Sequence, residues 1–206
     1  MCLVNDGVAD VVEIGEDYSD AVLFGQRWER RSFERCDFSE ADMRGLVTSG
    51  CTFTECTFGR TDLGDSKHTA SAFRSCTFDR TVLGGASFSS CSLLGSLFSA
   101  CAMRPITLQE TDLTLASLVG VVLRKADLRG LRLRETNLND ADLRETDLRN
   151  ADLVGARLLG TKFDGADLRG AKLDANAFVQ AQLRGARVNL DTAVSFAAAH
   201  GLVVSD

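Results

Sequence analysis

The hydrophobic pattern of this chain repeats every five residues. Counting by fives from Tyr18 reaches Leu23, Trp28, Phe33 and finally Val188 without a shift in phase. Of the 32 centres from residue 33 to residue 188, 27 are Leu or Phe. A helix repeats about every 3.6 residues and a strand every two, so neither amphipathic pattern fits. A short fixed period held for about 170 residues predicts an all-β solenoid.

A second regularity lies two residues before each centre. Of the 31 positions from Cys36 to Ala186, 27 are Ala, Cys, Ser, Thr or Val, and we call this position the small slot. Six of the seven cysteines occupy it, namely Cys36, Cys51, Cys56, Cys76, Cys91 and Cys101. There is no CxxC motif, and no histidine pair has the spacing of zinc ligands. We therefore interpret these cysteines as small buried side chains, and we expect no metal site, cofactor or disulfide.

A period of twenty lies over the period of five. Phe33, Phe53 and Phe73 are spaced by twenty residues, and so are Cys36, Cys56 and Cys76. Twenty residues are four pentads, which predicts a four-sided coil in which each residue stacks on its copy. Residues 16–190 are 35 pentads, or nearly nine coils. At the strand spacing of about 4.8 Å they form a rod on the order of 40 Å long.

Composition and charge narrow the class of protein. The chain has 206 residues, a net charge of −6 and 45% hydrophobic residues, which suits one globular domain. The negative balance disfavours direct binding to nucleic acid. No run of 18 apolar residues and no signal peptide are present, so we expect a cytoplasmic protein without a membrane span. Four of the six net negative charges lie in the first 32 residues.

Three segments are predicted: an acidic N-terminal segment (1–15), the repeat solenoid (16–190) and a terminal helix with its tail (191–206). In the last segment the period of five is lost. Asp191 is the expected N-cap, Thr192 to His200 the helix, and Gly201 the stop. We expect this helix to close the solenoid and to form a homodimer contact. The predicted contact residues are Val194, Phe196, Ala197, Leu202 and Val203.

No catalytic constellation is visible. The chain contains two histidines, His68 at a centre and His200 in the terminal helix, and no GxSxG, P-loop or HExxH motif. His68 is interpreted as a hydrogen-bonded core or edge residue without a chemical role. We therefore expect a protein that is not an enzyme.

Departures from the repeat are few. Leu46, Ile106 and Leu131 are large for the small slot, and Asn176 is polar. Pro105, the only proline, has no N–H to donate to a β ladder, so it predicts a corner or kink with either isomer of its peptide bond open.

Charged residues form rows at the same spacing. Asp127, Asp147 and Asp167 are twenty residues apart, with an arginine two residues after each. Two interpretations stay open. The rows are exposed ion pairs that add little stability, or they are spaced negative charge that imitates a phosphate backbone.

The later pentads carry a family resemblance. ADLRG at 126–130, ADLRE at 141–145 and TDLRN at 146–150 resemble the A(D/N)LXX pattern of the pentapeptide-repeat family. The resemblance covers about residues 16–190 and implies a right-handed quadrilateral β-helix whose centres and small slots point inward.

Within this family the chain most resembles the fluoroquinolone-resistance members. The likeness is carried by SAFRSCTFDRTVL (71–83), MRPITL (103–108), LRLRET (131–136) and GARVNLDTAVSFAAAHGL (185–202). It implies a dimeric, DNA-mimicking protein that binds DNA gyrase, inhibiting it or shielding it from quinolones or from a natural toxin. The acidic face for this contact is expected at Asp127, Asp142, Asp147, Asp152 and Asp167. A non-enzymatic scaffold or adaptor that binds another protein through a solenoid face is the alternative.

Overall fold

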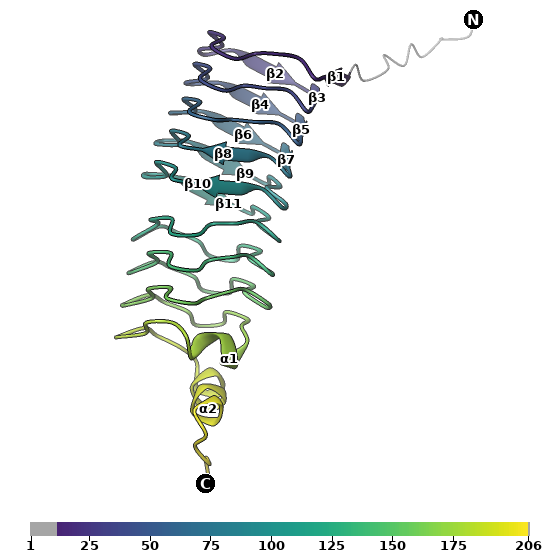
Figure 1. Ribbon diagram of the computed structural model, residues 1–206. Coiled ribbons are helices and arrows are strands. Elements are labelled where there is room, and N and C mark those ends of the chain that lie inside the picture. Colours follow the sequence, from purple (N-terminus) through teal and green to yellow (C-terminus); the bar gives the residue numbers. More distant parts are fainter. Residues whose placement is uncertain (1–11, 206) are drawn as a thin grey trace, which may run out of the picture.

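The computed structural model describes residues 12–205 as a parallel β-solenoid that ends in a helix (Figure 1). Most of the predicted segment 1–15 lies outside the described residues. The strands are β1 (Val12–Ile14), β2 (Arg27–Glu29), β3 (Ser32–Glu34), β4 (Val47–Ser49), β5 (Thr52–Thr54), β6 (Lys67–Thr69), β7 (Ala72–Arg74), β8 (Thr77–Asp79), β9 (Ser87–Ser89), β10 (Leu97–Ser99) and β11 (Thr107–Gln109). The helices are α1 (Ala175–Phe178) and α2 (Leu190–Ala199).

The strands pair in parallel with a register of twenty residues. The sheet orders are β1-β3-β5-β7, β10-β8 and β11-β9-β6-β4-β2. Phe33 pairs with Phe53, and Phe53 pairs with Phe73. Isolated bridges carry the same register on to Asp167 and Arg187. The predicted solenoid and its period of twenty are therefore confirmed.

Each coil has four sides, which we number by their rows of bridged residues. Side I contains Asp42, Asp62, Val82 and Ala102; side II contains Val47, Lys67, Ser87 and Thr107; side III contains Thr52, Ala72, Ser92 and Asp112; side IV contains Thr57, Thr77, Leu97 and Ser117. The corners between the sides are tight because the last residue of most pentads has a left-handed backbone. Leu115, for example, has φ 61° and Gly120 has φ 66°. This conformation explains why glycine recurs at that position.

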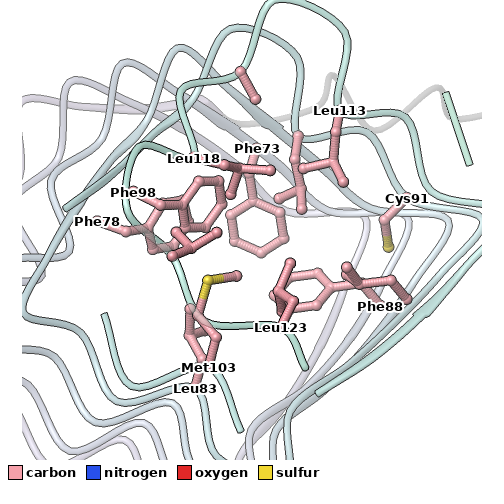
Figure 2. Close-up of a cluster of buried hydrophobic side chains, with 14 of the residues drawn as sticks. Phe73, Phe78, Leu83, Phe88, Cys91, Phe98, Met103, Leu113, Leu118 and Leu123 are labelled. Carbon is pink, nitrogen blue, oxygen red and sulfur yellow. The ribbon is translucent and has the colours of Figure 1, made fainter. Parts of the chain in front are cut away.

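The core is a column of centre residues (Figure 2). Phe33, Phe53 and Phe73 stack with ring centroids 5.0 and 4.6 Å apart. Leucine centres such as Leu113 and Leu123 continue the column toward the C-terminus. Stacking copies of one residue type buries the apolar surface without gaps, so the period seen in the sequence is also the period of the core.

Hydrogen bonding, as well as limited space, explains which residue types occupy the small slot. Many of its Ser, Thr and Cys side chains donate to the carbonyl of the centre residue in the preceding coil. Cys76 Sγ lies 3.4 Å from Phe53 O, Ser96 Oγ lies 2.9 Å from Phe73 O, and Thr61 Oγ1 lies 2.7 Å from Phe38 O. Ser, Thr and Cys are interchangeable here because each supplies one short donor. The slot cysteines are free thiols, which agrees with their interpretation as small buried residues.

The hydrogen-bonded ladder is interrupted on sides I and II, between the coil of residues 100–111 and the coil of residues 119–132. In the regular pattern, Ala102 N donates to Thr81 O at 3.0 Å and Asp142 N to Val121 O at 2.8 Å. Between these two described stretches the equivalent bonds from Val122 and Asp127 are missing, and no bridge joins Thr107 to Asp127. The bridges Leu97–Ser117 and Asp112–Arg132 hold the two coils together on sides III and IV.

Bulky residues explain this interruption. Ile106 and Leu131 are large residues in small slots of the two facing coils, and Pro105, whose bond to Arg104 is cis, has no N–H to donate. One large residue alone does not separate coils, because Leu46 O still accepts from Lys67 N at 2.8 Å.

The C-terminal end differs from the prediction in two details. Helix α1 replaces one corner of the last coil, although Phe178 keeps its place as a buried centre. Helix α2 begins at Leu190 rather than after Asp191. Asn189 precedes it with an extended backbone, and its Oδ1 accepts from Gly170 N at 3.0 Å. The last bond to the solenoid is therefore made by Asn189, and Asp191 lies in the first helical turn instead of at the N-cap.

Candidate functional site

Three of the predicted aspartates lie in one row on side II. Asp127, Asp147 and Asp167 are joined by consecutive bridges, as their spacing predicts. Each accepts hydrogen bonds from the backbone N, Nε and Nη2 of the arginine two residues later. The shortest N–O distance is 2.6 Å in all three pairs.

These ion pairs neutralise the row. The hydrogen bond from the arginine is the main cause of a lowered pKa at each carboxyl group, and it lowers the pKa of Asp167 to about 2. Exposed pairs of this kind add little to stability. The row therefore presents alternating charges at neutral pH and not a continuous negative face.

The other two predicted aspartates lie on other sides. Asp142 belongs to side I, where Arg144 Nε donates to its Oδ1 at 2.7 Å. Asp152 belongs to side III, 3.2 Å from Arg134 Nη1. A single acidic face made of all five aspartates is therefore wrong, because residues 15 or 25 apart fall on different sides of a twenty-residue coil.

Several carboxylates of the first two coils have no cationic partner among the described residues. Glu16, Asp17, Asp20 and Asp37 form no ion pair with any residue in the range 12–205. Asp17 and Asp37 are bridged neighbours in the row of side IV. Their Oδ1 atoms accept from the backbone N–H of the serine two residues on, at 2.9 and 2.8 Å. This acidic spot agrees with the concentration of negative charge that the sequence shows in its first 32 residues.

A polar plug closes the aromatic column at its N-terminal end. Arg31 occupies a small slot, with its guanidinium carbon 4.6 Å from the Trp28 ring and 4.8 Å from the Phe33 ring. It donates to Glu13 at 2.6 Å, and Glu13 also accepts from the Tyr18 hydroxyl. Burial and this hydrogen bond raise the pKa of Tyr18 to about 12. The signal missed in the sequence is that three of the first four small slots hold charged or polar residues, namely Glu16, Gln26 and Arg31.

At the other end, the predicted dimer residues separate into two groups. Phe196 packs inward with its ring 6.1 Å from that of Phe178, and Ala197 is half-buried. Val194, Leu202 and Val203 are exposed. The helix thus packs on the last coil through Phe196, whereas Val194 on α2 and Leu202 and Val203 in the tail after it remain exposed.

His68 is an ionisable residue that is fully buried in the core. His68 Nδ1 is 2.8 Å from Thr48 Oγ1, and its Nε2 is 3.0 Å from Ser66 Oγ. Burial lowers the pKa of His68 to about 3, so the ring is neutral at pH 7. The structure therefore places His68 in the core, as expected, with both ring nitrogens hydrogen-bonded.

Other chemistry is sparse in the part of the chain that the structure describes. Residues 12–205 contain no cluster of three or more His, Cys, Asp or Glu placed to hold a metal ion. Neither α1 nor α2 has the length and apolarity of a transmembrane span.

The repeated coils identify the class of protein. The family model for pentapeptide repeats matches eight copies over residues 32–67, 106–140, 141–175 and 151–189, which together are more than half of the chain. The chain belongs to the pentapeptide-repeat family.

A curated member of this family is similar to the chain in sequence. The pentapeptide repeat protein MfpA of Mycobacterium tuberculosis (strain ATCC 25618 / H37Rv) is 51% identical over 107 residues, which are 50% of this chain and 45% of MfpA. The match thus spans about half the length of that relative.

Two solved structures share the fold. QnrB1, a plasmid-mediated fluoroquinolone resistance protein, superposes with a TM-score of 0.81 at 22% identity, covering 93% of this chain and 97% of QnrB1. HetL of Nostoc sp. strain PCC 7120, involved in heterocyst differentiation regulation, gives a TM-score of 0.51 at 20% identity over 86% of this chain and 87% of HetL. At these identities the likeness concerns the fold alone.

Proposed function

We propose that this chain is a non-enzymatic, DNA-mimicking protein that binds DNA gyrase in the cytoplasm and protects it from fluoroquinolones. The observation that carries the proposal is the match to MfpA at 51% identity. The rod that nearly the whole chain shares with a fluoroquinolone resistance protein supports it. Gyrase is the partner that the sequence resemblance implies.

The charge distribution supports a local form of mimicry. DNA carries one charge per about 1.7 Å of its axis, whereas bridged aspartates repeat at the strand spacing of about 4.8 Å. Asp17 and Asp37 carry two such charges without an ion pair among the described residues. We propose that the acidic spot contacts a basic surface of gyrase, and that the Asp127 row contributes where basic side chains of the partner compete with its arginines.

We also propose that the protein is a homodimer through α2. Val194 on α2 is 39% exposed, and Leu202 and Val203 in the tail after it are 63% and 94% exposed, so this end of the chain offers apolar surface for a contact between copies. In this arrangement Phe196 packs on the last coil, and the exposed residues form the contact between the two copies.

Two matched pairs of substitutions test the acidic contact. Asp17→Asn combined with Asp37→Asn is expected to weaken gyrase binding by about tenfold and to flatten its salt dependence, because both charges are available to a partner. Asp127→Asn combined with Asp147→Asn removes the same number of charges from an ion-paired row, so a smaller effect is expected. Binding to the intact gyrase tetramer by surface plasmon resonance at two salt concentrations measures both. Equal affinity of the natural protein and both double variants would exclude the acidic spot. A larger effect of the Asp127 and Asp147 substitutions would move the contact to side II.

One observation favours the adaptor alternative. Leu97, Leu115 and Val119, on and beside side IV, are 43%, 56% and 44% exposed. No charged residue occurs between Arg80 and Arg104, so the middle of the rod is an uncharged belt. Apolar surface of this kind is typical of protein–protein contacts. A protein without effect on gyrase would bind its partner here.

A further inference from the structure

We propose that side IV is an interface on which a second copy of this chain docks side by side, with the two rods running in opposite directions. This contact differs from the homodimer contact proposed at α2, which lies at the end of the rod (Figure 1). It goes beyond the proposed function and does not depend on gyrase.

The charges of side IV are separated by sign along the rod. Its row of bridged residues runs without interruption from Asp17 and Asp37 in the first two coils to Arg157 near the C-terminal end. The positions between Asp37 and Arg157 carry no charge and are Thr57, Thr77, Leu97, Ser117 and Asn137. A face with one acidic end and one basic end is complementary to a second copy of itself when the two copies are antiparallel.

The positions of these charges define a register with Leu97 at its centre. Asp37 lies three coils before Leu97, and Arg157 lies three coils after it. A two-fold axis at the level of Leu97 therefore places Asp37 of each copy opposite Arg157 of the other. Both side chains are exposed, and neither forms an ion pair within the range 12–205. A parallel arrangement would instead set each of them against its own copy, where like charges repel.

A second pair of charges fits the same register. In the corner row that follows side IV, Arg60 lies two coils before the axis and Asp140 two coils after it. Arg60 is 2.6 Å from Glu40 in its own chain, whereas Asp140 has no ion pair among the described residues, so it is available to Arg60 of the other copy. At the opposite corner Glu55 and Glu135 face each other, and this unfavourable pair stands against two favourable ones.

Apolar side chains lie at the level of the axis. Leu97, Leu115 in the next coil and Val119 in the same coil as Leu115 are exposed. In the antiparallel register Leu97 meets Leu97 of the other copy, and Leu115 and Val119 of both copies flank it. Burial of this apolar surface supplies affinity, and the charges set the direction and register. The placement of opposite charges at equal distances from one apolar centre is what indicates a second copy as the partner.

The contact is small. From Asp37 to Arg157 the row spans six coil spacings, about 29 Å, and a side about three extended residues wide adds about 10 Å. Such a strip is smaller than the standard interface of about 800 Å² per partner, so we expect a weak association that depends on protein concentration and is weaker at high salt. Because Asp37 also belongs to the acidic spot, a partner bound there and a second copy exclude each other.

Charge reversal on side IV tests the contact. Sedimentation equilibrium is measured on the full chain carrying Leu202→Asp and Val203→Asp, which remove the contact proposed at α2. In this background we expect Asp37→Arg and Arg157→Asp each to weaken self-association by at least about tenfold. The two substitutions together are expected to restore it, because each acid again meets a base. The control is Lys67→Glu, an exposed charge reversal on side II, which is expected to leave the association unchanged.

The outcomes that would overturn the contact are specific. They are no concentration-dependent association, single variants that associate like the background chain, or a double variant as weak as the single ones. Small-angle X-ray scattering adds the geometry, because a side-by-side pair keeps nearly the length of one rod. An associated particle about twice as long as one chain would also overturn the contact. An unchanged melting temperature shows that each variant is folded.

Discussion

Replacing Phe53 by alanine is expected to lower the free energy of unfolding by about 3–5 kcal/mol. Phe53 is completely buried, and its ring lies between those of Phe33 and Phe73. Alanine leaves a cavity that the neighbouring coils cannot fill, because the ladder fixes their spacing. Urea denaturation followed by circular dichroism measures the change.

The matched control is Phe53→Leu. Leucine occupies most centres in the second half of the chain, so it suits the backbone at this position and fills part of the cavity. We expect it to cost less than half as much as alanine. Equal losses for the two variants, or a loss below about 1 kcal/mol for alanine, would contradict a core held by stacked centres.

Stability is expected to fall in acid because of His68. Burial lowers the pKa of His68 to about 3 in the folded protein, against about 6.5 in the unfolded chain. Below pH 6.5 the unfolded state binds a proton that the folded state does not bind. The stabilisation is therefore complete above pH 6.5 and is lost as the pH falls toward 3. One proton corresponds to about 1.4 kcal/mol per pH unit, or roughly 2–3 kcal/mol between pH 6.5 and 4.5.

Burial keeps the His68 ring neutral, and its hydrogen bonds suit the neutral form. Ser66 Oγ donates to Leu63 O at 2.7 Å, so it accepts from His68 Nε2, and Thr48 then donates to Nδ1. Both ring nitrogens are satisfied in the neutral form, and a second proton would face the Thr48 hydroxyl.

The control for this prediction is His68→Leu. Its stability and that of the natural protein are measured by denaturation at pH 7.5, 6.5, 5.5 and 4.5. The carboxylates contribute equally to the pH dependence of both proteins, so they cancel in the difference. The difference in stability between them is expected to change with pH by the amount that one proton predicts. Parallel pH profiles would show that His68 does not carry the dependence.

The repeat allowed much of the fold to be predicted from the sequence. A centre such as Phe53 and a slot such as Cys76 have the same neighbours one coil away, so one pentad determines the local contacts of the next. The ends lack such a copy. The Arg31 plug and the early start of α2 at Leu190 depend on contacts that occur once, and periodicity carries no information about them.

The surface was less predictable. The spacing of twenty residues correctly predicted that Asp127 stacks on Asp147. The same spacing places Asp142 on another side, and the predicted acidic face did not take this into account. The interrupted ladder had a signal in the large slot residues Ile106 and Leu131 beside Pro105. Leu46, in a regular coil, shows why a single such residue is an insufficient signal.

The most direct test of gyrase protection is a cleavage assay with purified gyrase, supercoiled DNA and a fluoroquinolone, into which this protein is titrated. The proposed function predicts that drug-induced cleaved DNA decreases as the protein reaches micromolar concentration, and that gyrase without the drug yields no additional cleaved DNA. Cleavage that stays constant throughout the titration would contradict the proposal and favour the adaptor alternative.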